Sequence, residues 1–491
     1  MYFIGYDIGS SSIKAALLDA DSGRCVASAI SPSREMPIQV PAKGWAEQEP
    51  ESWWQEIIAA TEMLRQQARI DFSAIGGIGI AYQMHGLVCV DKQQQVLRPA
   101  IIWCDSRAVH IGNRAFSALG KEYCLDHLLN SPGNFTASKL RWVYENEPHV
   151  YERIDKVMLP GDFIAMKLTG DVRTTVSGLS EGVLWDFKAN TISRTLLDYY
   201  QIDESLVPAI VPAFGTQGVL TAAAAAALHL PAGIPVTYRA GDQPNNALSL
   251  NVLRPGEAAA TAGTSGVVYA VHDKHASDLQ SRVNTFVHVS NDEQHLRDGV
   301  LMCLNGTGIA NSWLKNLLGD VDYAAMNSEA AACAPGADGL LVYPFGNGAE
   351  RILGSRHIGA SVRYLDFNRH GRRQLLRAVQ EGIVFGLNYG LEIMSTMDLK
   401  VHRVRAGNAN MFLSPLFREI FANTANTVIE LYNTDGAQGA ARGAAIGAGY
   451  VSMEDAFRGM ERLMVIEPET ALQTQYGDAY GKWLTELRSK L

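Results

Sequence analysis

Asp242 is the residue in this sequence whose type and position are best suited to acid–base chemistry. It follows an apolar segment that ends in Gly241, and Gln243 and Pro244 come next, a pattern typical of a strand end followed by a helix. A carboxylate in that position can take a proton from a hydroxyl group. It can equally cap the helix, and the local sequence alone slightly favours the cap.

A polar turn near the N-terminus, DIGSSSIK at residues 7–14, could hold phosphate groups. Its backbone amides, with Ser10, Ser11 and Lys14, can face phosphate oxygens, while Asp7 offers oxygen to Mg²⁺. A polar hairpin without chemistry is an equally good interpretation, because Gly and Ser are frequent in any turn.

A similar turn, AGTSG at residues 262–266, lies in the second half of the chain. Thr264 and Gly266 could contact phosphates there, although a plain glycine hairpin is favoured if this turn is considered alone. Phosphate turns at matching places in two halves are the arrangement of actin-like ATPases. The sequence contains neither GxxxxGK[ST] nor GxGxxG after a strand, which removes the main support for P-loop and Rossmann sites.

Two further segments carry side chains suited to a sugar. Gln83, Met84 and His85 follow an apolar strand, where the thioether would cover sugar carbons and the imidazole would bond a hydroxyl or carbonyl. A lone histidine in such a place is more often structural. Trp103 and Asp105 follow the next strand, and could stack on a sugar face and accept from its hydroxyls. A buried tryptophan beside an exposed turn is the alternative.

Alternating apolar segments predict the scaffold that must position these residues. In the first part we expect three strands, a helix and a strand: Tyr2 to Ile8, Ile13 to Asp19, Cys25 to Ile30, Pro50 to about Ala68, and Ile75 to Ala81. A similar order of strands returns at Glu257 to Thr261, Val267 to Val271 and Thr285 to Val289. The similarity between the halves is weak in residues, but it indicates a duplication.

Strands and helices continue to alternate towards the C-terminus, which indicates an α/β fold. We expect strands at Leu340 to Pro344, Arg403 to Ala406 and Val428 to Tyr432, and helices at Leu375 to Met397 and Pro415 to Asn423. We place a domain boundary near Asn246, giving domains at 1–246 and 247–491, with substrate-specific insertions at about 106–230. Glycines at 439, 443 and 447 share one helix face and predict a close backbone approach to a neighbouring element.

The composition and charge of the chain indicate its cell compartment and exclude some classes of partner. Hydrophobic residues make up 47% and charged residues 19% of the chain, as in globular enzymes. The net charge of -9 argues against nucleic acid as a partner. The six cysteines form no CxxC pair, the chain starts as a strand rather than a signal peptide, and the apolar stretch from Ala222 to Leu228 is too short to span a bilayer. We therefore expect a cytoplasmic protein with no membrane contact.

Taken together, ten segments resemble the FGGY family of carbohydrate kinases, and within it the xylulokinases. In the first half these are YDIGSS at 6–11, WAEQ at 45–48, QMHG at 83–86, WCDSR at 103–107 and LPGD at 159–162. In the second half they are GDQ at 241–243, AGTSG at 262–266, GNGAER at 346–351, RAGNAN at 405–410 and GAQGAA at 436–441. The resemblance covers nearly the whole chain.

The resemblance implies two ribonuclease H-like, actin-type domains, with a sugar and ATP in the cleft between them. It assigns Asp242 as the base and, with Asp7, as a Mg²⁺ ligand. The sugar-binding residues it implies are Gln83, Met84, His85, Trp103, Asp105, Asn134, Phe135, Asp242 and Gln243. The nucleotide-binding residues it implies are Ser10, Ser11, Lys14, Thr264, Gly266, Gly306, Gly407 and Asn410.

The sequence departs from the family pattern in two places. Only Gly407 and Asn410 are carried over where many relatives have a glycine run near the adenine, and GAER replaces a Ser-Gly-Glu-Arg loop. The implied reaction is phosphorylation of a ketopentose, D-xylulose at O5, by ATP. Gluconate, ribulose or glycerol remain alternative substrates, and a non-enzymatic actin-like protein or a sugar sensor are alternatives from other classes. The assembly is not fixed by the sequence, and a homodimer is our working expectation.

Overall fold

The computed structural model describes residues 1–491 and separates into two compact units. Unit 1 comprises Met1–Asn251, Phe286–His295 and Thr434–Met460, and unit 2 comprises Val252–Thr285, Leu296–Asn433 and Glu461–Leu491. The first change of unit lies close to the boundary expected near Asn246. The later returns of the chain to unit 1 had no signal in the sequence.

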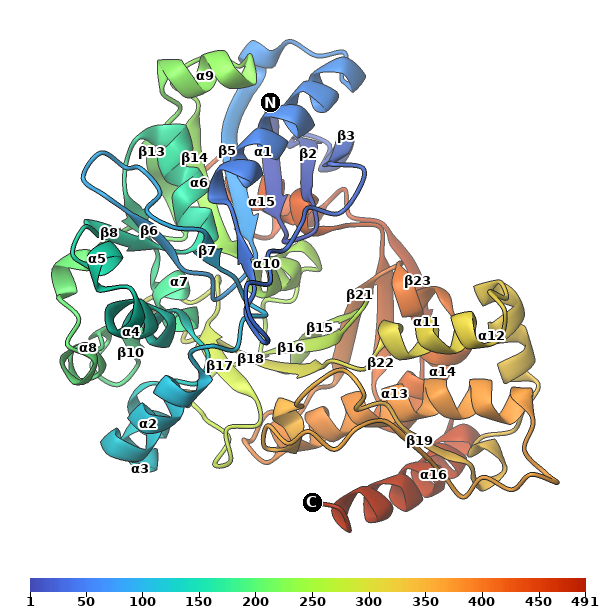
Figure 1. The fold of residues 1–491 in the computed structure, drawn as a ribbon. Helices are drawn as coiled ribbons and strands as arrows, with labels where there is room; N and C mark the ends of the chain where they lie inside the picture. Colours follow the sequence, from blue (N-terminus) through green and yellow to red (C-terminus); the bar gives the residue numbers. More distant parts are fainter. The chain divides into compact units, whose positions relative to one another are not determined.

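Unit 1 is built on a six-stranded sheet in the order β13-β14-β5-β1-β2-β3 (Figure 1). Its strands are β1 (Tyr2–Ile8), β2 (Ile13–Asp19), β3 (Arg24–Ser31), β5 (Ile75–Tyr82), β13 (Phe214–Val219) and β14 (Pro235–Gly241). The first three form the expected antiparallel meander, while β5 runs parallel to β1 and β14 parallel to β5. The meander, the helix and β5 are confirmed close to their predicted bounds.

The remaining elements of unit 1 surround this sheet. They are β4 (Glu47–Gln48), α1 (Pro50–Gln67), β6 (Val88–Val90), β7 (Ala100–Ile101), α2 (Val109–Leu119), α3 (Lys121–His127), α4 (Thr136–Asn146), α5 (Pro148–Tyr151), β8 (Lys156–Met158), α6 (Pro160–Thr169), β9 (Arg173–Thr174), α7 (Val176–Glu181), β10 (Trp185–Asp186), β11 (Thr191–Ile192), α8 (Arg194–Tyr200), β12 (Ala209–Ile210), α9 (Ala222–Leu228), α10 (Asp242–Ser249) and α15 (Gly436–Gly447). Most of the short helices and strands lie within residues 106–230, the region predicted to hold insertions.

Two helices pack on opposite faces of the unit 1 sheet. On one face α1 buries Trp53 and Ile57, and its Thr61 hydroxyl bonds the Tyr6 hydroxyl at 2.6 Å. On the other face α15 lies directly on the backbone of β1 and β5, because Gly5 and Gly79 point towards it: a Cβ added at either glycine would overlap α15 backbone atoms. Side chains alternate along a strand, so Gly5 and Tyr6 serve opposite faces.

The glycine stripe on α15 is used as the sequence predicts. A Cβ at Gly439 would lie 2.6 Å from the Ser249 Cβ on α10, and one at Gly443 would lie 2.5 Å from the Tyr238 ring on β14. A Cβ at Gly447 would overlap a backbone carbonyl of the same strand. The predicted close approach is confirmed, with β14 and α10 as the neighbours.

Unit 2 repeats the same core with a seven-stranded sheet in the order β17-β18-β16-β15-β21-β22-β23. Its elements are β15 (Glu257–Ala262), β16 (Gly266–His272), β17 (Asn284–Val287), β18 (Asp298–Leu304), α11 (Gly308–Leu317), α12 (Tyr323–Ala331), β19 (Leu341–Tyr343), β20 (Ser361–Arg363), α13 (Arg372–Ser395), β21 (Arg403–Gly407), α14 (Pro415–Ala425), β22 (Val428–Tyr432), β23 (Arg462–Ile466) and α16 (Thr470–Arg488). β15, β16 and β18 form an antiparallel meander, and β21 and β22 join it in parallel.

One expectation for the second meander is wrong. The segment Thr285 to Val289 was expected as its third strand, and the strand β17 does lie there, but the neighbour of β16 is β18. β18 is apolar and buried along nearly its whole length, so period-two alternation could not mark it. With β18 in place, the two units share the order and directions of five strands, as the predicted duplication requires. None of the helices combines the length and apolar character needed to cross a bilayer.

We predict that Gly79→Ala destabilises unit 1 by about 1–3 kcal/mol, the usual cost of forcing an added methyl group into a packed core. The added Cβ would overlap the Ala440 carbonyl of α15. Thermal and denaturant unfolding of the purified protein measure the change. The control is Gly481→Ala on the exposed face of α16, where nothing lies within 4 Å and alanine should stabilise the helix by about 0.5–1 kcal/mol. A Gly79→Ala protein with unchanged stability would contradict the close packing of α15.

Candidate active site

The strands β1, β5 and β14 end in register at one edge of the unit 1 sheet. Ile8 is paired with Tyr82, and Tyr82 is paired with Gly241. From these ends the chain enters the first polar turn, the loop 83–86 and α10. Ligands of parallel sheets bind beyond the carboxyl ends of the strands. The fold thus brings together three segments that the sequence singled out and that lie far apart along the chain.

Two carboxylates, Asp7 and Asp242, share this edge. Asp242 is the first residue of α10, and Asp7 lies against Gly436 at the N-terminus of α15, where a Cβ would overlap its Oδ2. Burial, and then the nearby Asp7 carboxylate, raise the pKa of Asp242 to about 7. Burial also raises the pKa of Asp7, while Lys14 opposes the rise. A cation or a transferred proton is therefore favoured here.

The first polar turn has the closed geometry of a hairpin. Ser10 accepts two hydrogen bonds: its carbonyl from Gln48 Nε2 at 2.7 Å and its hydroxyl from Trp103 Nε1 at 3.3 Å. Ser11 is exposed at the tip, and Lys14 is partly buried on β2. The indole of Trp103 is 46% exposed, so one side chain links this turn with the predicted sugar segment.

The ring of His85 is held by three partners. Its Nδ1 bonds the Glu181 carbonyl at 2.8 Å, and the ring meets Phe135 edge-on at 4.8 Å and Phe286 at 5.3 Å. A carbonyl oxygen only accepts, so Nδ1 carries the hydrogen and the neutral ring has its lone pair on Nε2. His85 also adopts a left-handed backbone conformation, with φ of 62°. The loop thus presents the imidazole in one orientation.

The side chain of Glu181 lies between the loop 83–86 and the end of β14. A Cβ at Gly241 would lie 2.7 Å from Met84 Cγ and would overlap Glu181 Oε2. Burial raises the pKa of Glu181 well above its ordinary value, and the Tyr82 hydroxyl is close to it. No motif marked Glu181, because a glutamate near the end of a short helix has no sequence signature.

In three amides predicted to bind the sugar, the side-chain oxygen is buried and has no hydrogen-bond partner. They belong to Gln83, Asn134 and Gln243. Buried polar atoms in proteins are nearly always paired, so these unpaired oxygens, after β5, before α4 and in the first turn of α10, are suited to a polar ligand. Phe135, also predicted to bind sugar, is buried, and its ring supports His85.

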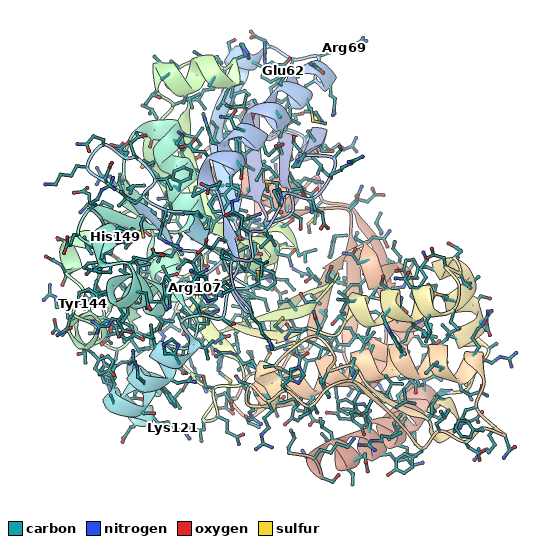
Figure 2. The ribbon with its side chains drawn as sticks, viewed as in Figure 1. Glu62, Arg69, Arg107, Lys121, Tyr144 and His149 are labelled. Atoms are coloured by element: carbon teal, nitrogen blue, oxygen red, sulfur yellow. The ribbon has the colours of Figure 1, made fainter.

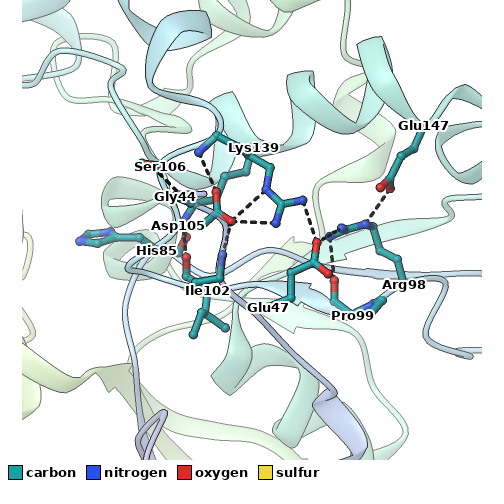
Figure 3. Close-up of polar contacts among 12 residues, drawn as sticks. Gly44, Glu47, His85, Arg98, Pro99, Ile102, Asp105, Ser106, Lys139 and Glu147 are labelled. Carbon is teal, nitrogen blue, oxygen red and sulfur yellow. Dashed lines mark hydrogen bonds and ion pairs between the residues drawn. The ribbon is translucent and has the colours of Figure 1, made fainter. Parts of the chain in front are cut away.

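Asp105 requires a correction. We expected its carboxylate to accept hydrogen bonds from a sugar, but it is fully buried and already engaged. Its oxygens accept from Ala46 N at 2.6 Å and Arg107 N at 2.8 Å, and an Arg107 nitrogen lies 2.8 Å away as an ion pair (Figure 3). The geometry therefore points to a structural role for Asp105, as the support of the segment that carries Trp103.

Arg107 connects Asp105 to a wider network of ion pairs in unit 1. Its side chain is buried, and Figure 2 shows its position in this unit. Arg107 pairs with Glu47 at 2.7 Å, Glu47 with Arg98 at 2.5 Å, and Arg98 with Glu147 at 2.7 Å. The network ties together segments around residues 47, 98–107 and 147. Because each buried charge has a partner, the network can hold these segments without an unpaired ion.

Unit 2 contains a pocket of about 480 Å³ next to its own polar turn. The predicted residues Thr264 and Asn410 line it. The turn is fixed by the start of α11, whose Gly308 and Ile309 amides donate to the Gly263 and Thr264 carbonyls at 2.8 and 3.1 Å. Further lining residues that the sequence did not indicate are Asn311, Ser312, Tyr323, Asn327 and Met411.

Comparisons with known proteins decide the family. Residues 2–249 match the model "FGGY family of carbohydrate kinases, N-terminal domain", and residues 258–452 match the C-terminal domain of the same family. The chain belongs to the FGGY family of carbohydrate kinases. It is an ATP-dependent sugar kinase of the two-domain, actin-like fold.

Relatives of this kinase include the xylulose kinase of Escherichia coli (strain K12), which is 30% identical over 90% of this chain and 88% of its own length. The xylulose kinase of Bacillus subtilis (strain 168) is 29% identical over 91% of this chain and 89% of its own length. Among solved structures, the xylulose kinase from Rhodospirillum rubrum has a TM-score of 0.88 and 26% identity, and the alignment covers 100% of this chain and 99% of that one.

Three glycines that the family resemblance predicts to bind the nucleotide do not line the 480 Å³ pocket. Gly306 packs on the Pro344 carbonyl, and Gly266 faces the Thr307 hydroxyl. Gly407 ends β21. Glu350, one of the family residues that the GAER loop retains, accepts from the Asn305 amide at 3.1 Å and so fixes the loop that leads to Gly306. These glycines are thus close in sequence to the lining residues Thr264, Gly308 and Asn410 without lining the pocket themselves.

We predict that His85→Ala lowers kcat/KM for the sugar about a hundredfold, while slow ATP hydrolysis without sugar changes less than about twofold. The reason is that the ring is held by the Glu181 carbonyl, Phe135 and Phe286, and none of these three residues is assigned to the nucleotide. Coupled assays measure both rates on one preparation. His127→Ala, which removes a ring paired with Asp186, is the matched control. Equal losses in the two activities would make His85 a purely structural residue.

Proposed function

We propose that this kinase transfers the γ-phosphoryl group of ATP to O5 of D-xylulose, with Asp242 as the general base. The observation that carries the proposal is the adjacency of the loop 83–86 to Asp242, since Met84 lies against Gly241. A sugar held by His85 and Met84 would reach the carboxylate. The xylulose kinases among the relatives, and the QMHG motif, favour a ketopentose over other sugars.

The chemistry asked of Asp242 fits its surroundings. In the proposed step its carboxylate takes the O5 proton, O5 forms a bond to the γ-phosphorus, and the bond from that phosphorus to the bridging oxygen of ADP breaks. A pKa of about 7 makes Asp242 a stronger base than an exposed carboxylate, yet it remains largely ionised just above neutral pH. Burial, and then the Asp242 carboxylate, raise the pKa of Glu181, which disfavours a second negative charge beside Asp242.

The residues present fit a Mg²⁺ ion that arrives with ATP. No group of three or more histidine, cysteine or acidic residues lies close enough to hold a metal alone. Asp7 and Asp242 are two neighbouring carboxylates in a desolvated place, and Mg²⁺ is commonly bound by one or two carboxylates together with substrate phosphates. When bound, the ion would neutralise developing phosphate charge. Ser10, Ser11 and Lys14 would contact phosphates from unit 1.

In unit 2 the nucleotide is proposed to occupy the 480 Å³ pocket. Its size and its lining of small, amide and apolar side chains suit a nucleoside. Thr264 would approach the phosphates, and Asn410 would border the base or ribose. The glycines at 266, 306 and 407 are proposed to act through the backbone around this pocket.

The location and assembly are further proposals. Six free cysteines support a reducing, cytoplasmic environment. A homodimer is supported by a run of exposed apolar side chains in unit 2, with Tyr364 at 64% and Phe367 at 91% exposure. Such residues on a surface often mark a contact between chains.

We expect D-xylulose to give the highest kcat/KM in a panel of ketopentoses, polyols and aldonates, measured by ADP release. Ribulose, glycerol and gluconate are the competitors, because the phosphate turns and the base would serve all of them equally. If gluconate or glycerol exceeded D-xylulose by about tenfold, roughly 1.4 kcal/mol of transition-state binding, the substrate would be misassigned while the kinase activity stood.

Asp242→Asn should keep the fold and nucleotide binding but lower kcat by about two to four orders of magnitude, the range for removing a positioned base. Asparagine preserves the size of the side chain and an oxygen that can accept the Gln243 amide at the start of α10, so a role at the helix start alone would leave turnover nearly normal. Calorimetry separates any loss of MgATP affinity from the chemical step. Asp203→Asn, at the cap of a short helical turn in the same unit, is the control. A mutant that retains more than about a tenth of wild-type kcat would overturn the base assignment.

A further inference from the structure

The fully buried side chain of Lys139 joins the two segments that the proposed sugar site depends on. From α4, its Nζ donates to the His85 carbonyl at 2.8 Å and to the Ile102 carbonyl at 3.0 Å (Figure 3). His85 carries the imidazole proposed to bind sugar, and Ile102 precedes Trp103. One ammonium group thus bonds two loops that come from different strands.

A buried lysine is costly, which makes this arrangement informative. Lysine is among the residues least often found fully buried, and burial lowers the pKa of Lys139 to about 7, although Asp105 and Cys104 oppose the shift and Arg107 adds to it. Either protonation state can make the two bonds, because the neutral amine keeps two N–H donors and the ammonium has three. The clamp therefore does not depend on the charge of Lys139.

The first turn of α4 adds a second, independent hold on the same loop. The Thr136 hydroxyl donates to the Gly86 carbonyl at 3.3 Å, and Phe135, just before α4, packs edge-on against the His85 ring. The His85 backbone has φ of 62°, a conformation that costs free energy for a residue with a Cβ. Contacts from outside the loop must compensate for that cost, and α4 supplies two of them, from Thr136 and Lys139.

We propose that Lys139 is a positioning residue that sets the spacing between His85 and Trp103, and so fixes the geometry in which the sugar is held. The inference rests on the proposed function only in taking these two side chains as the sugar contacts. Without the amine, two buried carbonyls lose their donor and the loops can separate. Both hydrogen bonds of Lys139 go to these two loops and neither goes to a phosphate turn, so the effect on the nucleotide should be the smaller one.

The test is Lys139→Met, which keeps the length and apolar stem of the side chain and removes both donors. We expect kcat/KM for the sugar to fall about ten- to a hundredfold, chiefly through KM. Sugar-independent ATP hydrolysis and the KM for ATP should change less than about twofold. Lys167→Met, at a partly exposed lysine of the same unit that pairs with Glu51, is the matched control and should match wild type in all three measurements.

A second variant covers the case in which Lys139→Met fails to fold. Thr136→Val keeps the shape of the side chain and removes only the hydroxyl, and it should raise the sugar KM about threefold with normal ATP hydrolysis. Parallel losses of sugar and ATP activities in a folded Lys139→Met protein, unchanged sugar kinetics in that protein, or unchanged sugar kinetics in Thr136→Val would each overturn the proposal.

The assay also separates this inference from the substrate assignment. All variants are measured with the sugar that wild type uses best in the panel. If that sugar is not D-xylulose, the substrate proposal fails. The ratio of kcat/KM between variant and wild type on the preferred sugar still decides the role of Lys139.

Discussion

The backbone of α15 can pack directly on β1 and β5 only because Gly5 and Gly79 have no side chains there, and much of unit 1 depends on this contact. The contact brings Gly436, the first residue of α15, against the Asp7 carboxylate. Helix N-termini favour negative charge, so the packing of a late segment helps a carboxylate at the end of the first strand to remain in a poorly hydrated place. A segment more than 400 residues away in sequence thus completes the first half of the site.

The electrostatics of the strand edge follow from that packing. Asp7 and Asp242 are neighbouring carboxylates, and burial and mutual repulsion raise the pKa of Asp242 to about 7. In water the repulsion between two such carboxylates would be weak. At low dielectric it is strong, and binding of a proton or a metal ion relieves it. Unit 2 has no comparable carboxylate pair at its turn, and its pocket is lined by hydroxyl, amide and apolar groups suited to the rest of a nucleotide.

The sequence predicted those features that are local or repeated. Strand β1, the polar turn after it and the step from Gly241 to Asp242 were predictable because apolar runs and turn residues alternate there. β18 was missed because a strand buried on both faces does not alternate, and its apolar run alone does not distinguish a strand from a helix. Asp105 was misjudged for a different reason: sequence shows a carboxylate after a strand, but not that Ala46 and Arg107 already occupy its oxygens.

The burial and the contacts of Lys139 could not be predicted from the sequence. It lies in the segment GNFTASKL, where the family resemblance had drawn attention to Asn134 and Phe135. A lysine on a helix is normally at the surface, so its type argues against burial, and nothing local shows that Nζ reaches carbonyls 54 and 37 residues away. Side chains that touch a ligand are marked by motifs, because their chemistry must suit the ligand. Those that hold the motifs in place are chosen by the three-dimensional spacing of backbone carbonyls, and that spacing exists only once the chain has folded.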